Sequence, residues 1–528
     1  MDIEGDIVED EKVLDEHSHD TSLFEIRPKK VVYPKNTSDL EKIVKYAMEN
    51  NIPFAGRSAG TDMTGGPLTD SIVLSFTKYM NHFSVDGLSA EVEPGVYYRD
   101  FEMDDIELPT YPASKSICAL GGMIMNNSGG EKTLRYGQTK KYVEEMDMTL
   151  SDGNTYTFKK LSKEELEEKK GQDDFEGEIY RKMHKLLDDN YDLIQSKKPK
   201  VSKNSSGYYL WDVWNKETFD LTQLFCGSQG TLGLLSKAKV RLVEKKKHEK
   251  LVVLFFKDWK ALPQVVKEIL PIEPEGLETF DDATLKLGLR FMPKVAKKAG
   301  ESFFRFAFRF IPEFFIGIKM FGLPKLVVLI QLAEDDKGVL DNKVRKIKET
   351  LSDNNVWIRV SPNKEDANKY WTMRRESFNL LRQNVKGKRT APFIDDFCVS
   401  PEKIPEFLPK AIKLLEDSGI EANITGHAGS GNLHIIPLMD FSKNTEREKI
   451  VKISDQFYDL VVEYGGSITA EHNDGIIRTP YLEKMFGSDM VRLFKEVKNI
   501  FDPKNLFNPG KKVDGDKSNI SKYMVKEN

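Results

Sequence analysis

The sequence predicts an α+β protein of two domains, and three observations indicate this class. The 528 residues are enough for two or more domains of roughly 100–200 residues each. Hydrophobic residues make up 39% and charged residues 31%, which allows large cores and excludes disordered and fibrous proteins. Strand and helix patterns alternate through both halves of the chain, and Pro, Asn or Gly ends most of them.

Residues 1–27 are expected to form an acidic, weakly ordered arm. The first 20 residues carry nine acids and one base, with little apolar surface to offset the entropy of ordering them. This composition is the opposite of a secretory signal or a transit peptide, and no run of about 18 uncharged apolar residues occurs in the chain. Because the three cysteines, Cys118, Cys226 and Cys398, are also widely spaced, we expect a cytoplasmic protein.

The first domain is expected over residues 28–245. The segments VVYP, SDLEKIVKYAMENN and IPFAGRSAG predict a strand, a helix and a strand, because their apolar residues have strand or helical spacing and a breaker ends each run. Further β structure is predicted at SIVLSF, AEVEPGV, YVEEMDMTLSDG and LLSKAKVRLVE. The basic stretch at 244–250 indicates the boundary.

A second domain is expected over residues 246–480. Its segments LVVLFF, DWKALPQVVKEIL, PEGLETFDD and LPKLVVLIQLAEDD alternate strand and helix patterns, which is typical of an α+β domain on an antiparallel sheet. A helical segment, YLEKMFGSDMVRLFKEVKNIFD, then opens residues 481–512. The Lys- and Ser-rich residues 513–528 are expected to be a flexible tail.

Three glycine-dense segments, 55–66, 111–143 and 224–242, lie next to predicted strands. In AGRSAGTDMTGG, the glycines allow positive φ and a close approach of backbone N–H groups to an anion such as a pyrophosphate. This loop matches neither the G-x-x-x-x-G-K-[ST] pattern nor the G-x-G-x-x-G pattern, and alone it is also compatible with a hairpin that binds nothing. Three such segments together indicate one long ligand.

Two histidines are candidate metal ligands. His427 and His434 lie seven residues apart across a Gly-Ser-Gly turn in ITGHAGSGNLHIIP, and Glu471 and His472 follow in SITAEHNDG. Imidazole and carboxylate ligands suit Zn²⁺, Mn²⁺ or Fe²⁺ and leave coordination positions open for a substrate. The alternative is a pair of surface or capping histidines.

Six motifs, in their order along the chain, resemble one family. RSAGTDMTGG, ALGGMIMNNSGG with RYG, GSQGTLG, GHAGSGNLH, EHNDG and FDPKNLFNPGK are similar to motifs of the FAD-linked 2-hydroxy acid dehydrogenases, within the vanillyl-alcohol-oxidase-type flavoproteins. That group includes D-lactate dehydrogenase, the glycolate oxidase flavin subunit and D-2-hydroxyglutarate dehydrogenase. The resemblance covers residues 20–512 and implies a two-subdomain FAD-binding domain with an inserted α+β antiparallel-sheet cap, to which residues 481–512 return.

The resemblance implies FAD that is bound non-covalently. Some distant relatives carry a flavin-linked histidine in the first loop, and Asp62 is the nearest residue to that position here. Gln229 stands where the family usually has Glu, which puts one polar contact in doubt. The residues that the resemblance places at the cofactor are Arg57, Ser58, Ala59, Gly60, Thr61, Asp62, Gly65, Gly66, Pro112, Ser114, Gly121, Gly122, Asn127, Ser128, Gly129, Gly227, Gly230, Thr231, Gly233 and Asn508.

The resemblance also implies roles in the reaction. His427, His434 and Glu471 hold the divalent metal, Zn, Mn or Fe, to which the substrate hydroxyl and carboxylate bind. His472 is the base, since an imidazole with an unperturbed pKa of about 6.5 accepts a proton at neutral pH while hydride passes to flavin N5. The alternative role for His472 is to orient a metal ligand.

The segment WTMRRESFNLLRQNVKGKR (371–389) supplies candidates for binding a substrate carboxylate. Arg374 matches the family's W-x-x-R clamp, and Arg375 is the alternative. Lys386 or Lys388 is a candidate for a distal carboxylate, although a solvated basic loop explains both equally well. The family pattern is broken at Phe378 and Ile436, so the sequence leaves the substrate open.

An aromatic segment lies at 301–325, ESFFRFAFRFIPEFFIGIKMFGLPK. Alternation of Phe with Arg and Ala predicts a strand, and residues 281–325 carry nine bases against four acids. Such a surface suits peripheral contact with anionic lipid at the inner face of a membrane, where a quinone is available. The alternative is that these phenylalanines form a core or the seam of a homodimer.

The function that the resemblance implies is oxidation of a D-2-hydroxy acid, such as D-lactate, glycolate or D-2-hydroxyglutarate, to the 2-oxo acid. The scattered cysteines exclude a local iron–sulfur site, so a quinone, a cytochrome or an electron-transfer flavoprotein is expected to reoxidise the flavin. Two alternatives are an FAD transferase similar to alkyl-glycerone-phosphate synthase and a non-catalytic flavin subunit that relays electrons. A net charge of −5 argues against nucleic acid as a partner.

Overall fold

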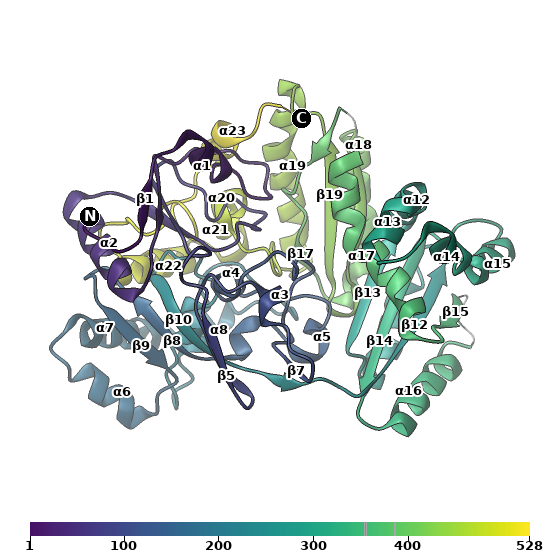
Figure 1. The fold of residues 1–528 in the computed structure, drawn as a ribbon, viewed down its shortest axis with the longest axis horizontal. Coiled ribbons are helices and arrows are strands. Elements are labelled where there is room, and N and C mark those ends of the chain that lie inside the picture. Colours follow the sequence, from purple (N-terminus) through teal and green to yellow (C-terminus); the bar gives the residue numbers. More distant parts are fainter. Residues whose placement is uncertain (353, 355, 385–386, 528) are drawn as a thin grey trace.

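The computed structural model describes residues 1–352, 354, 356–384 and 387–527. Strands of the first 245 residues form two sheets and a short ribbon, and the residues that follow form one large sheet with helices on it (Figure 1). The last helices return to the first part of the molecule, so that both ends of the chain lie away from the far end of the large sheet (Figure 1).

The N-terminal sheet has the strand order β1-β2-β4-β3. Strands β2 and β3 both run parallel to β4, and helix α2 connects them. The Asn36 side chain caps α2 by accepting from the N–H of Asp39, and the buried residues Leu40, Ile43 and Val44 form its apolar face. The strand, helix and strand predicted here are therefore confirmed; their bounds are β1 (Asp6–Val8), β2 (Lys30–Tyr33), α2 (Thr37–Asn50), β3 (Phe54–Arg57) and β4 (Ile72–Ser75).

An antiparallel five-stranded sheet follows, with the order β5-β6-β10-β8-β9. Leu493 and Phe501 of the C-terminal helix α22 (Ser488–Phe501) lie in the same hydrophobic core as Met146 of this sheet. The strands are β5 (Phe83–Asp86), β6 (Ser89–Val92), β8 (Val143–Thr149), β9 (Thr155–Lys159) and β10 (Leu234–Arg241), and the ribbon is β7 (Ile106–Glu107) with β11 (Val243–Glu244). The helices are α3 (Tyr98–Phe101), α4 (Leu120–Asn126), α5 (Thr133–Tyr136), α6 (Lys163–Lys170), α7 (Phe175–Asp189), α8 (Tyr191–Ser196), α9 (Leu210–Val213) and α10 (Thr222–Phe225).

The large sheet has the order β15-β12-β14-β13-β18-β19-β16, with β17 also paired to β19, and every pairing is antiparallel. This confirms the antiparallel α+β architecture predicted for the second half of the chain. The strands are β12 (His248–Phe256), β13 (Gly276–Asp281), β14 (Leu326–Glu334), β15 (Val356–Val360), β16 (Arg389–Thr390), β17 (Phe397–Cys398), β18 (Glu421–His427) and β19 (Asn432–Met439). The helices are α11 (Leu262–Ile269), α12 (Asp282–Arg290), α13 (Met292–Lys298), α14 (Phe303–Phe308), α15 (Ile311–Met320), α16 (Lys337–Thr350), α17 (Lys364–Asn384), α18 (Ile404–Asp417) and α19 (Asn444–Glu463).

The predictions of a weakly ordered arm and a flexible tail are wrong. The arm forms β1 and α1 (Glu11–Glu16), and the tail forms α23 (Lys517–Tyr523). Phe24 and Met524 are buried and form a β-bridge, and the N–H of Val525 donates to the carbonyl of Leu23 at 3.0 Å. Apolar side chains of the two segments therefore share one core, to which the arm gives Leu23, Phe24 and Ile26 and the tail gives Ile520, Met524 and Val525. The remaining helices are α20 (Gly475–Arg478) and α21 (Leu482–Phe486).

The strand predicted within 301–325 is also wrong, because the segment forms α14 and α15. The Ser302 side chain caps α14 by accepting from the N–H of Arg305, which favours a helix over the strand that the alternation indicated. The core interpretation fails for most of these phenylalanines: Phe306 is buried, but Phe304 and Phe308 are exposed. Within the described residues, no helix is both long and apolar enough to cross a membrane.

Candidate active site

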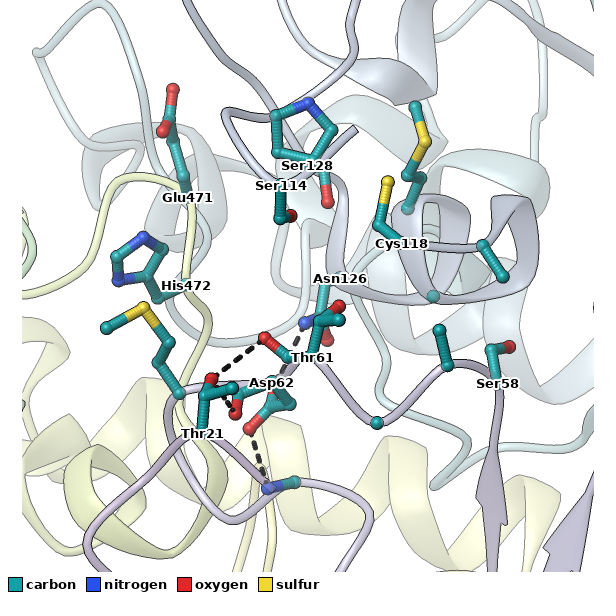
Figure 2. Close-up of a pocket in the computed structure, with 18 of the residues that line it drawn as sticks. Thr21, Ser58, Thr61, Asp62, Ser114, Cys118, Asn126, Ser128, Glu471 and His472 are labelled. Carbon is teal, nitrogen blue, oxygen red and sulfur yellow. Dashed lines mark hydrogen bonds between the residues drawn. The ribbon is translucent and has the colours of Figure 1, made fainter. Parts of the chain in front are cut away.

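A cavity of about 490 Å³ lies between the glycine-rich loops of the first domain and the large sheet. Figure 2 shows Glu471 and His472 on one side of this cavity, across from Ser58 and Cys118. The cavity therefore combines two groups of residues that lie far apart in the sequence, the predicted cofactor loops and the predicted metal ligands.

The first loop follows directly from strand β3 and is braced by Asp62. One Asp62 carboxylate oxygen accepts from the N–H groups of Thr64 at 2.7 Å and Gly66 at 3.0 Å, and the other accepts from the Asn126 side chain at 3.0 Å. The Thr21 hydroxyl donates to the Asp62 carbonyl at 2.7 Å (Figure 2). Gly60 and Gly65 have φ values of 69° and 79°, which lie in the left-handed region that residues with a Cβ atom rarely adopt.

Most of the predicted cofactor residues line the cavity, and the others lie behind its wall. Asn508, for example, donates to the carbonyls of Gly66 at 2.9 Å and Gln229 at 2.8 Å, which ties two of the loops together. The lining residues are Ser58, Ala59, Gly60, Thr61, Asp62, Gly66, Pro112, Ser114, Gly121, Gly122, Ser128, Gly129, Gly230 and Gly233. The residues that are not part of the lining are Arg57, Gly65, Asn127, Gly227, Thr231 and Asn508.

Features of this wall fit a long anionic cofactor. At Gly122 and Gly230, an added Cβ would have no protein atom nearer than 3.7 Å and 4.0 Å respectively, so it would occupy cavity space. The guanidinium of Arg57 lies under Gly60, and its Nη1 is buried without a hydrogen-bond partner among the described residues. An unsatisfied buried donor is costly, and an oxygen of a bound anion would satisfy it.

The β18–β19 hairpin explains how residues seven apart meet. Thr425 pairs with His434 across the hairpin, and His427 is two residues further along β18, so both histidines project from the same face of the sheet. The two ring centroids lie 5.3 Å apart. One ligand atom from each of His427, His434 and Glu471 can lie within 4.8 Å of the others, which is the spacing of a metal site.

Hydrogen bonds at Nδ1 orient both candidate ligands. Nδ1 of His427 lies 2.5 Å from a carboxylate oxygen of Glu278, and Nδ1 of His434 lies 3.0 Å from the carbonyl oxygen of Asp395. These partners leave each Nε2 for a metal, the arrangement common to metal-binding histidines. Nε2 of His427 lies 3.3 Å from Glu471, whose other oxygen accepts from the buried Lys203 at 2.6 Å.

The pKa values of His434 and Glu471 favour metal binding, whereas that of His427 does not. Burial lowers the pKa of His427, but the carboxylates of Glu278 and Glu471 outweigh it and raise this pKa above its usual value. Burial lowers the pKa of His434, with help from the neighbouring His472 and His427, to about 3, so His434 is neutral. Burial raises the pKa of Glu471, but His427 and Lys203 outweigh it and hold that pKa well below its usual range. The site therefore presents a neutral imidazole and a charged carboxylate to a cation.

His472 has a different environment. Its Nδ1 lies 2.8 Å from a carboxylate oxygen of Asp395, and its ring stacks on His434 with centroids 5.1 Å apart. Burial lowers the pKa of His472, but the carboxylates of Asp396 and Asp395 outweigh it and raise this pKa to about 9. The surroundings of His472 therefore raise its pKa above the unperturbed value of about 6.5, and its role as the base stays a prediction.

Asp396 holds the segment that carries Glu471 and His472. One of its oxygens accepts from the Thr469 hydroxyl at 2.7 Å and from the backbone N–H groups of Ala470, Glu471 and His472 at 2.8, 2.8 and 2.9 Å. Asp396, His434 and His472 also form a second group with metal-ligand spacing. Because one oxygen of this carboxylate accepts from four donors and the other accepts from the Asn432 side chain, the group with His427 is the better metal site.

The candidate carboxylate-binding residues divide between the cavity and the surface. Arg374 and Arg375 on α17 both line the cavity, where Nη2 of Arg374 lies 3.1 Å from Glu278 and Arg375 pairs with Glu131. Lys388 is not part of the lining and pairs with the exposed Glu421 at 2.9 Å. Lys386 lies outside the described residues.

Four residues of the site were missed by sequence reasoning. Asp395 and Asp396 form an adjacent acidic pair just before β17, inside the apolar run PFIDDF, and that context was a usable signal. Glu278 in β13 and Lys203 in a polar loop had no local signal, because each meets the site only through strand pairing or chain packing.

Two family models match the chain. The model described as "FAD linked oxidases, C-terminal domain" matches residues 245–512, and the one described as "FAD binding domain" matches residues 28–159. The glycolate oxidase subunit GlcD of Bacillus subtilis is 27% identical over 94% of this chain and 91% of that protein. The D-lactate dehydrogenase of Archaeoglobus fulgidus is 26% identical over 92% of this chain and 91% of that protein. The D-2-hydroxyglutarate dehydrogenase of Pantoea ananatis is 26% identical over 94% of this chain, which spans only 49% of that longer protein.

Solved structures show the same fold. A 4-ethylphenol oxidase from Gulosibacter chungangensis superposes with a TM-score of 0.68 at 16% identity, over 97% of this chain and 95% of that one. An alkyldihydroxyacetonephosphate synthase superposes with a TM-score of 0.66 at 16% identity, over 96% of this chain and 83% of that one. At such identities the likeness shows the fold alone, and it confirms the predicted α+β flavoprotein architecture.

Proposed function

From the premise that the chain belongs to the FAD-linked oxidase family, we propose that it catalyses the FAD-dependent, metal-assisted oxidation of a D-2-hydroxy acid to the 2-oxo acid. Electrons then pass to a separate acceptor. The observation that carries the proposal is that the candidate metal ligands and the candidate flavin loops line one cavity. The names of the relatives, which include D-lactate dehydrogenase, glycolate oxidase and D-2-hydroxyglutarate dehydrogenase, support this substrate class.

The cavity also suits a substrate that is an acid. Arg374, Arg375 and Arg382, all on α17, contribute to its lining. A guanidinium is permanently charged and can bind a carboxylate through two parallel hydrogen bonds. Because Glu278 contacts both Arg374 and His427, it fixes the carboxylate-binding side chain relative to the metal ligand.

The residues fit both groups that the reaction requires. FAD bound along the glycine-rich wall would supply the hydride acceptor, and a divalent ion on Nε2 of His427, Nε2 of His434 and the Glu471 carboxylate would act as a Lewis acid on the substrate hydroxyl. Glu278 and Asp395 hold the two histidine rings in the tautomer that presents Nε2. Lys203 keeps Glu471 charged and in place.

His472 accepts the hydroxyl proton at Nε2 in this scheme. Asp395 binds Nδ1 and stabilises the imidazolium that results, and Arg478 in turn donates to the other oxygen of Asp395 at 2.5 Å. The raised pKa makes His472 a good proton acceptor. A divalent charge nearby lowers the pKa of a neighbouring imidazole, so metal binding and deprotonation of His472 are expected to be coupled.

The test is an anaerobic substrate screen on FAD-loaded protein with its metal content measured on the same sample. We expect D-lactate, glycolate or D-2-hydroxyglutarate to bleach the visible flavin band, and chelation to abolish bleaching while leaving the flavin bound. If no 2-hydroxy acid bleaches the flavin, the proposal fails and an electron-relay subunit is favoured. Bleaching without steady reduction of an added acceptor would instead favour a transferase.

A further inference from the structure

An exposed apolar surface, which we name the aromatic patch, protrudes from the connection between strands β13 and β14. Nine of the fifteen exposed large apolar side chains of the described residues lie within residues 303–323. Helices α14 and α15 carry most of them and lie at the end of the molecule opposite the N-terminus (Figure 1). The patch consists of Phe303, Phe304, Phe308, Ile311, Phe314, Phe315, Ile318, Phe321 and Leu323, with exposed fractions of 41–94%.

Helix α15 is apolar over most of its surface, and one of its apolar stripes is directed outward. Ile311, Phe314, Phe315 and Ile318 have the i, i+3, i+4, i+7 spacing of one helical face, and all four are exposed. In an ordinary surface helix this stripe faces the core. Here Met320 is the buried residue, so the wider apolar stripe has no covering within the described residues.

The patch is held by an ion-pair cluster beneath it. Glu313 of α15 lies 3.0 Å from Nζ of Lys369 and 3.2 Å from Nε of Arg359, and Lys369 also donates to the carbonyl of Arg309 at 2.6 Å. Phe306 on the inner side of α14 is buried. The outward direction of the phenylalanines is therefore built into the packing of the two helices.

Phe321 occupies a position that a bulky residue disfavours. It ends α15 with a φ of 57°, where glycine is the usual residue, and its side chain is 94% exposed. Within the described residues, no burial of the Phe321 ring offsets the free-energy cost of this backbone conformation. A contact with a partner outside the chain would offset it.

Most of the exposed charges within residues 281–325 are positive. All four acids of residues 281–325 are buried or half-buried and engaged, as Asp282 is with Lys286 and Lys325, and Glu301 with Arg309. Eight of the nine bases in the same range are exposed. Five of these bases form no ion pair with any described residue: Arg290, Lys297, Lys298, Arg305 and Lys319. The exposed charge of residues 281–325 is therefore predominantly positive.

We propose that the aromatic patch docks the protein on an anionic lipid surface, with the phenylalanines inserted at the level of the head groups and the bases against the lipid charges. Aromatic and aliphatic side chains flanked by Lys and Arg are the side chains that bind such an interface. A second copy of the chain is the poorer occupant, since a two-fold contact would bring two surfaces of the same positive charge together. The inference does not depend on the proposed reaction.

The test is cosedimentation of the full FAD-loaded protein with vesicles of phosphatidylcholine alone or mixed with phosphatidylglycerol. We expect binding only to the mixed vesicles, and weaker binding when NaCl rises from about 0.05 M to about 0.5 M. F304S/F308S and K297E/K298E are each expected to lower the partition coefficient roughly tenfold or more, given the transfer free energy of a phenylalanine and of a base near anionic lipid. Neither variant touches the cavity, so the flavin spectrum should be unchanged.

Matched controls separate the patch from general surface effects. L88S/V339S removes two exposed apolar side chains elsewhere, and K163E/K452E reverses two exposed lysines elsewhere, and both should bind vesicles as the wild type does. The proposal is overturned if the wild type binds no vesicles, or if the patch variants bind as well as the wild type. It is also overturned if the wild type self-associates in solution through the patch, so that F304S/F308S yields a monomer while vesicle binding is absent.

Discussion

Replacing Asp396 with alanine is expected to weaken divalent-metal binding by roughly 10–100-fold, although Asp396 is not one of the three proposed ligands. One oxygen of this buried carboxylate accepts from the Thr469 hydroxyl and from three successive backbone N–H groups, which places Glu471 and His472. A hydrogen bond to a charged group contributes about 1.5–3 kcal/mol. A hundredfold loss of affinity corresponds to about 2.7 kcal/mol, so partial relaxation of the freed segment is enough to produce it.

The assay is calorimetric titration of metal-free, FAD-loaded protein with Zn²⁺ or Mn²⁺, with the flavin spectrum as a check on folding. Asp39→Ala is a matched control, because Asp39 is also buried and accepts from the backbone N–H groups of Glu4, Gly5 and Lys35, far from the cavity. Both variants should lower Tm, but only Asp396→Ala should lower metal affinity. Metal affinity equal to that of the wild type in Asp396→Ala would refute the reasoning.

Three further predictions concern separate parts of the molecule. His434→Ala should lose the divalent metal while it retains FAD, which metal analysis and the flavin spectrum would show; retention of stoichiometric metal would exclude this ligand set. Gly122→Leu should lower FAD content about tenfold or more without lowering the Tm of the apoprotein, because Gly122 is helical and its added side chain would enter the cavity; normal FAD content would mean that the cofactor lies elsewhere. Burial raises the pKa of Glu275 to about 7, although Lys132 lowers it, so the folded state favours the protonated carboxyl. Its contribution to stability falls as pH rises from 4.5 to about 7, by up to about 3 kcal/mol, and the Tm of wild type minus that of Glu275→Gln should fall over the same range; a constant difference would contradict the raised pKa.

The sequence predicts those residues of the site at which the local backbone or strand geometry allows only one or a few residue types. Gly60 and Gly65 adopt positive φ in the first loop, so the loop's shape requires glycine and leaves a visible pattern. His427 and His434 belong to one hairpin, so their spacing alone brings their rings to the same face. Such signals are local in the chain.

The partners of these residues could not be predicted in the same way. Glu278 contacts His427, and Lys203 contacts Glu471, although the partners are distant in sequence. The local sequence around a single acid or base does not indicate such a contact. The pKa of His472 depends on two carboxylates more than 70 residues away in sequence, as the separations of 76 and 77 residues show. Only the fold brings these charges together.

The aromatic segment failed as a strand prediction for a related physical reason. Sequence patterns are interpreted on the assumption that apolar residues face inward, and in α14 Phe304 and Phe308 face outward. The predictions for the two terminal segments were wrong because a few buried side chains, such as Leu14 and Ile520, are enough to order these segments. These side chains pack against the rest of the folded protein. Amino-acid composition alone does not predict that a terminal segment packs against the folded protein.

In the proposed function, a flavin and a divalent metal share one cavity. The most direct measurement is anomalous diffraction at the zinc or manganese absorption edge, from crystals grown with FAD and the metal. We predict one strong peak bounded by Nε2 of His427, Nε2 of His434 and the Glu471 carboxylate, with the isoalloxazine ring in the same cavity. A peak at any other site, or a flavin ring outside this cavity, would contradict it.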